Sequence, residues 1–217
     1  QFGLAVRRAS RHADPKRFSK ELFLTAATVN PAEIGHMYLR STAKLRDKSR
    51  FFVDKLPVNY LNIPLILAAL PEAKIVHLVR SPMDACFASF KQLFADAYLH
   101  SYDQCEMARH HVRYRDLMTH FRHEFPGRII DISYEATARN LECNAVKLIS
   151  ALELPWEDAC LNFHESTSGV ATASSVQVRE PAHTRSIGRW RRYETELSPM
   201  LNELTRLGVR IEGVPLD

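Results

Sequence analysis

Three side chains that can bind or stabilise anions stand at the ends of predicted strands. Lys55 ends the short segment 51–55 (FFVDK), Arg80 ends the β-prone run 74–80 (KIVHLVR), and Tyr134 ends the run 128–134 (RIIDISY). In α/β proteins with parallel sheets, ligands gather at the carboxyl ends of the strands. We therefore expect these positions to contribute to a binding site.

Arg80 is the most informative of the three because a helix start follows it at once. Ser81 supplies the predicted cap, Pro82 the first helical position and Asp84 the acid of the first turn. The free N–H groups of such a helix end favour an anion, and a guanidinium can hold phosphate through two charge-assisted hydrogen bonds. Phosphate binding by Arg80 is one interpretation, and an ion pair with a surface carboxylate is the other.

Two further features allow a functional and an ordinary interpretation. Lys55 is either a surface lysine or a group that neutralises charge developing on a transferred group. The segment 174–190 (SSVQVREPAHTRSIGRW) carries hydroxyls, three arginines and one glycine, Gly188. It is either a solvated loop or a lid over a polyanion.

The order of the predicted elements indicates an α/β domain with a mainly parallel sheet. The first fifty residues read as helices, one of them starting at Asn30-Pro31, and a strand is expected at 51–55. The run 74–80 is continuously β-prone, which predicts a strand covered on both faces. The remaining predictions are a strand at 128–134 and helices at about 59–70 (starting or bending at Pro64), 82–94, 103–125, 141–152 and 190–207.

Composition sets limits on the class of protein. The 217 residues, 46% of them hydrophobic and 25% charged, suit a single globular domain over 1–217. The net charge of +4 is mild for a nucleic-acid-binding domain but suits a small polyanion. No apolar run reaches the roughly 18 residues that span a bilayer, and no secretory signal is present.

The cysteines and histidines predict neither disulfides nor a metal site. The four cysteines form no CxxC pair, and Cys86, Cys143 and Cys160 sit among apolar helical neighbours. We therefore expect buried free thiols in a reducing, cytoplasmic compartment. His77 lies mid-strand and reads as a core residue, the other histidines lack ligand spacing, and no GxSxG elbow indicates a hydrolase.

Taken together, five segments resemble the sulfotransferases that use 3′-phosphoadenosine 5′-phosphosulfate (PAPS). The resemblance is to the bacterial branch often fused to tetratricopeptide repeats and related to tyrosylprotein sulfotransferases, and it covers about two thirds of the chain. It implies a P-loop-NTPase-like three-layer α/β fold with a central, mainly parallel sheet flanked by helices. The segments keep the family order and are VDKLPVNYL (53–61), KIVHLVRSPMDACFASFKQLF (74–94), PGRIIDISYE (126–135), LPWEDACLNFHE (154–165) and TASSVQVREPAHTRSIGRWRRYE (172–194).

The resemblance implies a role for each matching residue. Lys55 would stabilise charge on the moving sulfuryl group, and Ser174 would assist the transition state. Arg80 would grip the 3′-phosphate of the donor. Further nucleotide contacts would come from Tyr134, Gln177, Val178, Gly188 and Arg189. PAPS would be the co-substrate and no metal would be needed, because positioning and cationic side chains suffice for an in-line sulfuryl transfer.

The sequence departs from the family pattern in two places. Where the family has a serine eight residues after the phosphate-binding arginine, this chain has Ala88, with Ser89 next to it as the expected substitute. The Gly-Thr-Thr-rich phosphosulfate loop and the acidic base that follows it are absent, and glycine is scarce at seven residues. We expect the chain to be a fragment of a sulfotransferase domain without its first strand and loop, and the base to lie upstream of residue 1.

Two functions from different classes remain after this reading. The first is a PAPS-dependent sulfotransferase acting on a hydroxyl acceptor such as a peptide tyrosine, a sugar or a small alcohol. The alternative is a catalytically inactive nucleotide-binding or scaffold module of the same fold, favoured by Ala88 and the absent loop. A P-loop kinase is disfavoured because no GxxxxGK[ST] motif occurs. The partners expected are the acceptor only, with no nucleic acid and no membrane span, and the oligomeric state is open.

Overall fold

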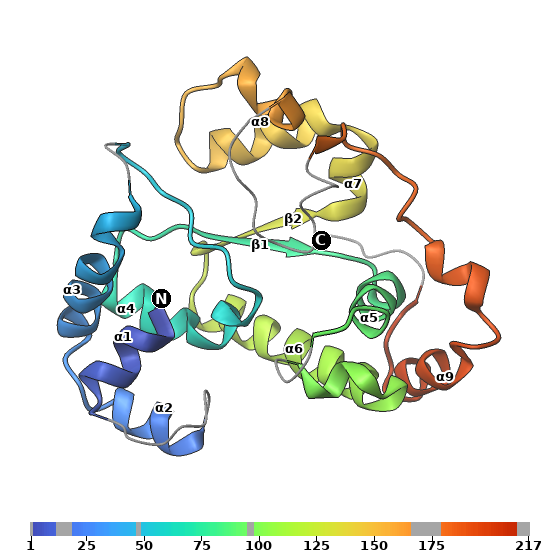
Figure 1. Ribbon diagram of the computed structural model, residues 1–217, viewed down its shortest axis with the longest axis horizontal. Helices are drawn as coiled ribbons and strands as arrows, with labels where there is room; N and C mark the ends of the chain where they lie inside the picture. The colour runs from blue at the N-terminus through green and yellow to red at the C-terminus, as the bar shows by residue number, and fades with distance from the viewer. Residues whose placement is uncertain (1, 12–18, 47–48, 95–97, 166–178, 212–217) are drawn as a thin grey trace. The chain divides into compact units, whose positions relative to one another are not determined.

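The computed structural model describes residues 2–11, 19–46, 49–94, 98–165 and 179–211 (Figure 1). The chain divides into two compact units, residues 1–75 and 76–217. The first unit is helical, and the second carries nearly all of the sheet. The fold class is α/β, as predicted, and the described residues form one two-stranded sheet.

Helices in the first unit pack around α3, as the sequence predicts for its first fifty residues. The unit contains α1 (Phe2–Ala9), α2 (Lys20–Ala26), α3 (Pro31–Thr42) with the 3-10 turn η1 (Ala43–Leu45), and α4 (Ile63–Ala69). α1 and α4 both contact α3. The shared core is formed by Phe2, Ala5, Val6, Leu22, Ala26, Ile34, Tyr38 and Ala69.

Local sequence explains where α3 begins and why α4 can approach it closely. The Asn30 side chain accepts a hydrogen bond from the Ala32 amide at 3.0 Å, and Pro31 occupies the first turn. Gly35 faces the end of α4, where a Cβ would lie 2.2 Å from the Ala69 carbonyl oxygen. Only a residue without a side chain fits this backbone contact.

The predicted strand at 51–55 is wrong, because these residues form no strand and are all exposed. Side chains hold the segment instead of a sheet ladder. The Tyr38 hydroxyl donates to Asp54 Oδ2 at 2.9 Å, and the Asn59 amide lies 3.4 Å from Asp54 Oδ1. The predicted helix at 59–70 consists of the 3-10 helix η2 (Pro57–Asn62) followed by α4, so the change occurs beside Pro64 as expected.

In the second unit, two parallel strands are joined by a helical crossover (Figure 1). β1 (Ile75–Val79) leads into α5 (Pro82–Phe90), η3 (Leu99–Tyr102) and the long helix α6 (Gln104–Glu124), and β2 (Ile129–Ser133) follows. Asp103 caps α6 through the Glu106 amide at 2.8 Å, and Gly127, at φ 72°, lies in the break after it. The predicted helix 103–125 is confirmed, whereas α5 ends four residues before the expected Phe94.

The expectation that β1 is covered on both faces is wrong. Val76 and Leu78 are 43% and 57% exposed, while the alternating residues Ile75, His77 and Val79 are half-buried. The alternation follows from the way that α6 approaches the sheet. Tyr114 of α6 contacts His77, and Arg122 of α6 reaches β2, so this helix covers one face of the strands.

The described residues after β2 form only helices and irregular segments, and the core of the second unit lies between α5, α6, η7 and α9. After β2 come α7 (Tyr134–Arg139), which was not predicted, α8 (Leu141–Ala151), η4 (Asp158–Cys160), η5 (Phe163–Glu165), η7 (Arg189–Tyr193) and α9 (Ser198–Arg206). The predicted helix 190–207 is thus two helices. The core consists of Met83, Cys86, Met107, Ala108, Trp190, Leu197, Met200, Leu204 and Val209.

The cysteines are free, but their burial differs from the prediction. Cys86 is buried in the core, and the loss of solvent around its thiol raises the pKa of that group to about 12. Cys143 is exposed on α8 and Cys160 is half-buried, so the expectation of a buried thiol fails at both. Over the described ranges, no helix has the length and apolar character needed to cross a bilayer.

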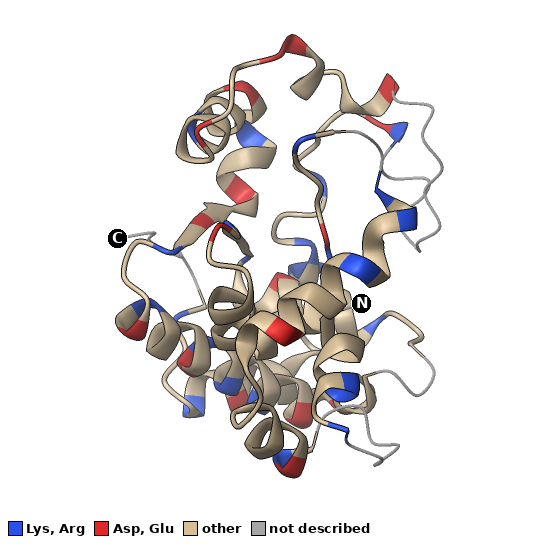
Figure 2. Cartoon of the chain, turned by 90° about the vertical axis from the view of Figure 1, so that its left-hand side faces the viewer, with Lys and Arg blue, Asp and Glu red and all other residues tan. Residues whose placement is uncertain are grey.

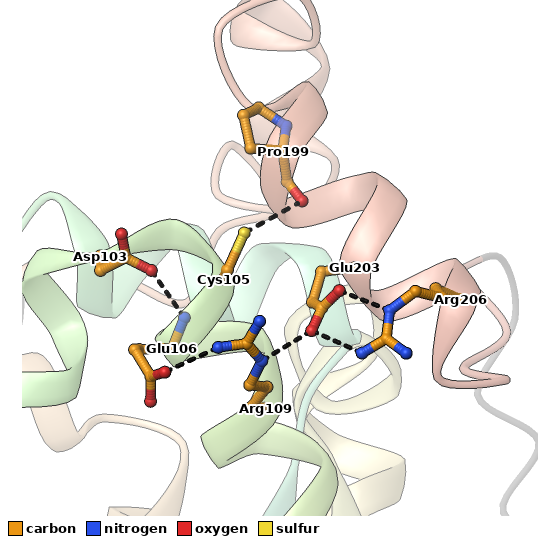
Figure 3. Close-up of polar contacts among 7 residues, drawn as sticks. All are labelled: Asp103, Cys105, Glu106, Arg109, Pro199, Glu203 and Arg206. Atoms are coloured by element: carbon orange, nitrogen blue, oxygen red, sulfur yellow. Dashed lines mark hydrogen bonds and ion pairs between the residues drawn. The ribbon is translucent and has the colours of Figure 1, made fainter.

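An ion-pair network joins α9 to α6 (Figure 3). The Glu203 carboxylate, 9% exposed, accepts hydrogen bonds from Arg109 Nε of α6 at 2.7 Å and from Arg206 Nε of α9 at 2.7 Å. Arg109 also pairs with Glu106 at 2.7 Å. The hydrogen bonds from Arg206 and Arg109 lower the pKa of Glu203 to about 2. This network anchors the C-terminal helix and with it the preceding segment 189–197.

We expect Glu203→Gln to lower the thermal unfolding midpoint at neutral pH by several degrees, because Arg109 and Arg206 then lose their charge-assisted hydrogen bonds to Glu203 and Arg109 keeps only Glu106. The folded pKa lies below the ordinary 4.5, so the network stabilises the fold above that pH and its contribution is lost as the pH falls toward about 2. Thermal unfolding followed by circular dichroism across this range tests the effect. Glu194→Gln, at an exposed position, is the control, and a pH-independent difference from wild type would contradict the assignment.

Candidate functional site

Arg80 leaves the end of β1 and is held by two groups from distant parts of the chain. Its guanidinium lies over the Tyr134 ring, 4.6 Å from the ring centroid, and its Nη2 donates to the Ser186 carbonyl at 3.0 Å. Neither group neutralises its charge. The Nε of Arg80 is buried and has no hydrogen-bond partner among the described residues. The guanidinium is therefore oriented and retains a donor for an anion.

Arg80 and Tyr134 meet because the two strands are held in register by side chains three residues earlier. His77 Nδ1 lies 2.5 Å from Asp131 Oδ1 across the sheet. Arg122 donates two hydrogen bonds to the same carboxylate, from Nε to Oδ2 at 2.6 Å and from Nη2 to Oδ1 at 2.9 Å. Counting three residues onward along each strand gives Arg80 and Tyr134.

The charge state of this pair follows from its surroundings. Burial lowers the pKa of His77 despite the nearby carboxylate, so the ring is neutral. Because a carboxylate only accepts, Nδ1 carries the proton and Nε2 accepts from the Tyr114 hydroxyl. Burial alone would raise the pKa of Asp131, but hydrogen bonds from Arg122 and His77 outweigh it and hold that pKa below its usual value. The prediction of His77 as a satisfied core residue is confirmed.

The start of α5 differs from the predicted anion-binding helix end. The Ser81 side chain forms no cap hydrogen bond. Instead, the Ser81 amide donates to Glu135 Oε1 at 2.8 Å. The Glu135 carboxylate of α7 thus accepts the hydrogen bond of the Ser81 amide, one of the N–H groups that were expected to bind an anion. The two groups meet because β2 lies beside β1, so that α7 begins near the end of β1. The amide of Ser81 is therefore not free, and Arg80 is the cationic side chain at this strand end.

Asp84 ties the segment before η7 to α5. Its side chain is 2% exposed, and Oδ2 accepts from the Gly188 amide at 2.6 Å. Gly188 has φ +67°, a left-handed conformation that strains residues with a side chain, so a glycine is required at this turn. Asp84 Oδ1 is buried without a partner in the described part of the chain. This contact places Ser186 against Arg80 and Arg189 beside α5.

A local excess of positive charge results from this packing. Lys91 follows α5 directly, and its pKa is lowered by burial and then by the charges of Arg189 and Arg80. Lys and Arg are otherwise distributed over many elements and interspersed with Asp and Glu (Figure 2). The cation cluster of Arg80, Lys91 and Arg189 therefore depends on how α5, β1 and η7 pack, and the mild net charge of +4 does not reveal it.

The structure brings together four of the predicted site residues. Arg80, Tyr134, Gly188 and Arg189 lie in the second unit around the start of α5. Ser89 lies on α5 near its end. Lys55 belongs to the first unit, where it is exposed next to Asp54. The predicted residues Ser174, Gln177 and Val178 lie outside the described residues.

Sequence reasoning missed the residues that position the arginine. Asp131, Glu135 and Lys91 were not singled out, and Asp84 was read only as a helix-start acid. A signal for Asp131 was present, since a charged residue inside a β-prone run is unusual unless it is paired. Within the described ranges, no group of three or more His, Cys, Asp or Glu side chains is arranged to hold a metal ion.

Comparison with known proteins supports one family. The model of the sulfotransferase family matches residues 4–158. An uncharacterized protein of Aquifex aeolicus (strain VF5) is 34% identical over 183 residues, which is 83% of this chain and 24% of that protein. This chain therefore spans about a quarter of the length of that relative.

We expect Asp131→Asn to destabilise the second unit by about 2 kcal/mol, because Arg122 and His77 lose charge-assisted hydrogen bonds in a half-buried setting. Urea unfolding followed by circular dichroism measures this loss. Asp116→Asn on the exposed side of α6 makes the same chemical change without removing an ion pair of the described residues, and should stay close to wild type. Equal stability of both variants would show that the pairing does not hold the strands.

Proposed function

Because this chain belongs to the sulfotransferase family, we propose that the protein transfers a sulfuryl group from PAPS to a hydroxyl acceptor. The acceptor class is a peptide tyrosine, a sugar or a small alcohol. The tetratricopeptide-associated branch remains part of this proposal. The site around Arg80 is the proposed contact for the nucleotide.

The observation that carries the proposal is the state of Arg80. The Arg80 side chain stacks on the Tyr134 ring and donates a hydrogen bond to the Ser186 carbonyl. These contacts fix the orientation of the guanidinium, and neither neutralises its positive charge. The unpartnered Nε and the neighbouring Arg189 add donors and charge on the same side of α5. A phosphate monoester fits such a fork through parallel N–H···O bonds. We assign this place to the 3′-phosphate of the donor.

The other predicted residues complete the proposed nucleotide site. Tyr134 stacks against the Arg80 guanidinium, and the Gly188 amide is bound to Asp84. Tyr134, Gly188 and Arg189 are the proposed nucleotide contacts beside Arg80. Gln177 and Val178 are proposed contacts by resemblance, and so is Ser89.

The chemistry requires little from the protein beyond position and charge. When bound, PAPS supplies an activated sulfuryl group whose bond to the phosphate oxygen breaks as the bond to the acceptor oxygen forms. Lys55 is proposed to stabilise the negative charge that develops on the leaving oxygen, and Ser174 to donate a hydrogen bond in the same transition state. The proton of the acceptor hydroxyl passes to a general base.

Arg80→Gln should weaken binding of adenosine 3′,5′-bisphosphate by about 10- to 100-fold, since charge-assisted hydrogen bonds to the phosphate are lost. Binding of 5′-AMP should change little, because it lacks the 3′-phosphate. Isothermal titration calorimetry with both nucleotides measures the contrast. Arg139→Gln on α7 serves as the charge-matched control, and an unchanged affinity of the Arg80 variant for the bisphosphate would remove this residue from the site.

Lys55→Ala in the full protein should lower turnover by about 100-fold or more while the affinity for adenosine 3′,5′-bisphosphate stays near wild type. The reason is that charge on the leaving oxygen is present only in the transition state. Transfer of labelled sulfate from PAPS to a panel of hydroxyl acceptors provides the assay, with Lys44→Ala as the control. Equal losses of binding and turnover would refute the transition-state role. Nucleotide binding by the wild type without transfer to any acceptor would favour the inactive binding module.

A further inference from the structure

We propose that Lys91 is a ligand-binding residue of the anion site, where it forms with Arg80 and Arg189 a three-cation cradle for a phosphate monoester. This inference rests on the proposed function for the identity of the monoester, the 3′-phosphate of the nucleotide. The cradle itself rests on the packing of α5 against η7.

The geometry of α5 places Lys91 on the side of the helix that carries the site. Successive residues of an α-helix are separated by about 100° around its axis, so residues four and seven positions after Asp84 share its face. These residues are Ala88 and Lys91. Asp84 is the residue that binds the Gly188 amide, which shows that this face points toward the segment containing Arg189.

Aromatic contacts confirm that Lys91 and η7 are neighbours. The Nζ of Lys91 lies 5.5 Å from the centroid of the Phe87 ring. The same ring packs against Tyr193 of η7, with centroids 5.2 Å apart. Arg189 begins η7 directly after the Gly188 turn. The lysine therefore lies along the surface that η7 contacts, with its ammonium group near the Phe87 ring.

Within the described ranges, no carboxylate forms an ion pair with the three cations of the cradle. Among the described residues, none of Arg80, Lys91 and Arg189 forms an ion pair. The two carboxylates at the start of α5 bind backbone amides, since Asp84 accepts from Gly188 and Glu135 accepts from Ser81. Repulsion from Arg189 and Arg80 adds to burial in lowering the pKa of Lys91. Like charges gathered in this way are relieved by a bound anion, and a dianion relieves them most.

This arrangement offers an alternative to the substitution expected from the sequence. Ser89 was expected to replace the hydroxyl missing at Ala88. On α5, however, Ser89 lies about 100° around the axis from Ala88 and about 140° from Asp84. Lys91 returns to the face of Asp84 and Ala88, and its long side chain can span one turn of the helix. The geometry therefore favours the lysine as the additional donor.

The test compares Lys91→Gln, Ser89→Ala and wild type by calorimetric titration with adenosine 3′,5′-bisphosphate, 5′-AMP and inorganic phosphate. We expect Lys91→Gln to weaken binding of the bisphosphate about tenfold, to leave 5′-AMP nearly unchanged and to reduce the salt dependence of bisphosphate binding. Lys147→Gln on α8 is the charge-matched control. Thermal unfolding of each variant checks that the exposed Lys91 position affects binding and not folding.

Each outcome separates this inference from the proposed function. Bisphosphate binding that depends on Arg80 but not on Lys91 overturns the role of Lys91 and leaves the function standing. If Ser89→Ala loses affinity for the bisphosphate and Lys91→Gln does not, the role of Lys91 is likewise overturned and the proposed function stands. Weak or absent nucleotide binding together with Lys91-dependent binding of inorganic phosphate supports the cradle and contradicts the nucleotide function. Absence of binding by all three ligands overturns both.

Discussion

The pairing of His77 with Asp131 is the interaction on which the rest of the second unit depends. It joins the two strands through side chains, and Arg122 links the pair to α6. Arg80 lies three residues after His77, and Tyr134 lies three residues after Asp131. The register of the two strands therefore sets the stacking of the guanidinium on the ring. A different register would leave the arginine at the strand end without a platform and free to pair with surface carboxylates.

The carboxylates around Arg80 bind backbone amides and form no ion pair with the guanidinium among the described residues. Asp84 and Glu135 each accept an N–H, one from the Gly188 turn and one from the start of α5. These bonds position the loop and the helix around Arg80. Among the described residues, neither carboxylate forms an ion pair with Arg80, which is oriented instead by the Tyr134 ring and the Ser186 carbonyl. The Glu203 network supports this from a distance by anchoring the helix that follows η7.

The candidate site was partly predictable. Arg80 and Tyr134 end β-prone runs, and strand ends of parallel sheets are where ligands gather, so their positions followed from local pattern. Glu135 carries no such signal, because it contacts the Ser81 amide, fifty-four residues earlier in the chain. Lys91 carries none either, because only the packing of α5 and η7 brings Arg189 near it. The strand expected at 51–55 failed for a similar reason. A short apolar run becomes a strand only when a neighbouring strand pairs with it, and Tyr38 and Asn59 hold Asp54 instead.

The amino-acid sequence by itself determined the starts of α3 and α6, the two strands of the sheet and the family. Caps such as Asn30 and Asp103, the break at Pro126-Gly127 and the apolar runs act within a few residues, so they can be read directly. Tertiary structure decided which charges meet. The cross-strand pair, the amide contacts of Asp84 and Glu135, and the gathering of Lys91 with two arginines arise from packing of β1, β2, α5 and η7. Electrostatic interactions depend on distance in space and on burial, and neither is encoded in the spacing of residues along the chain.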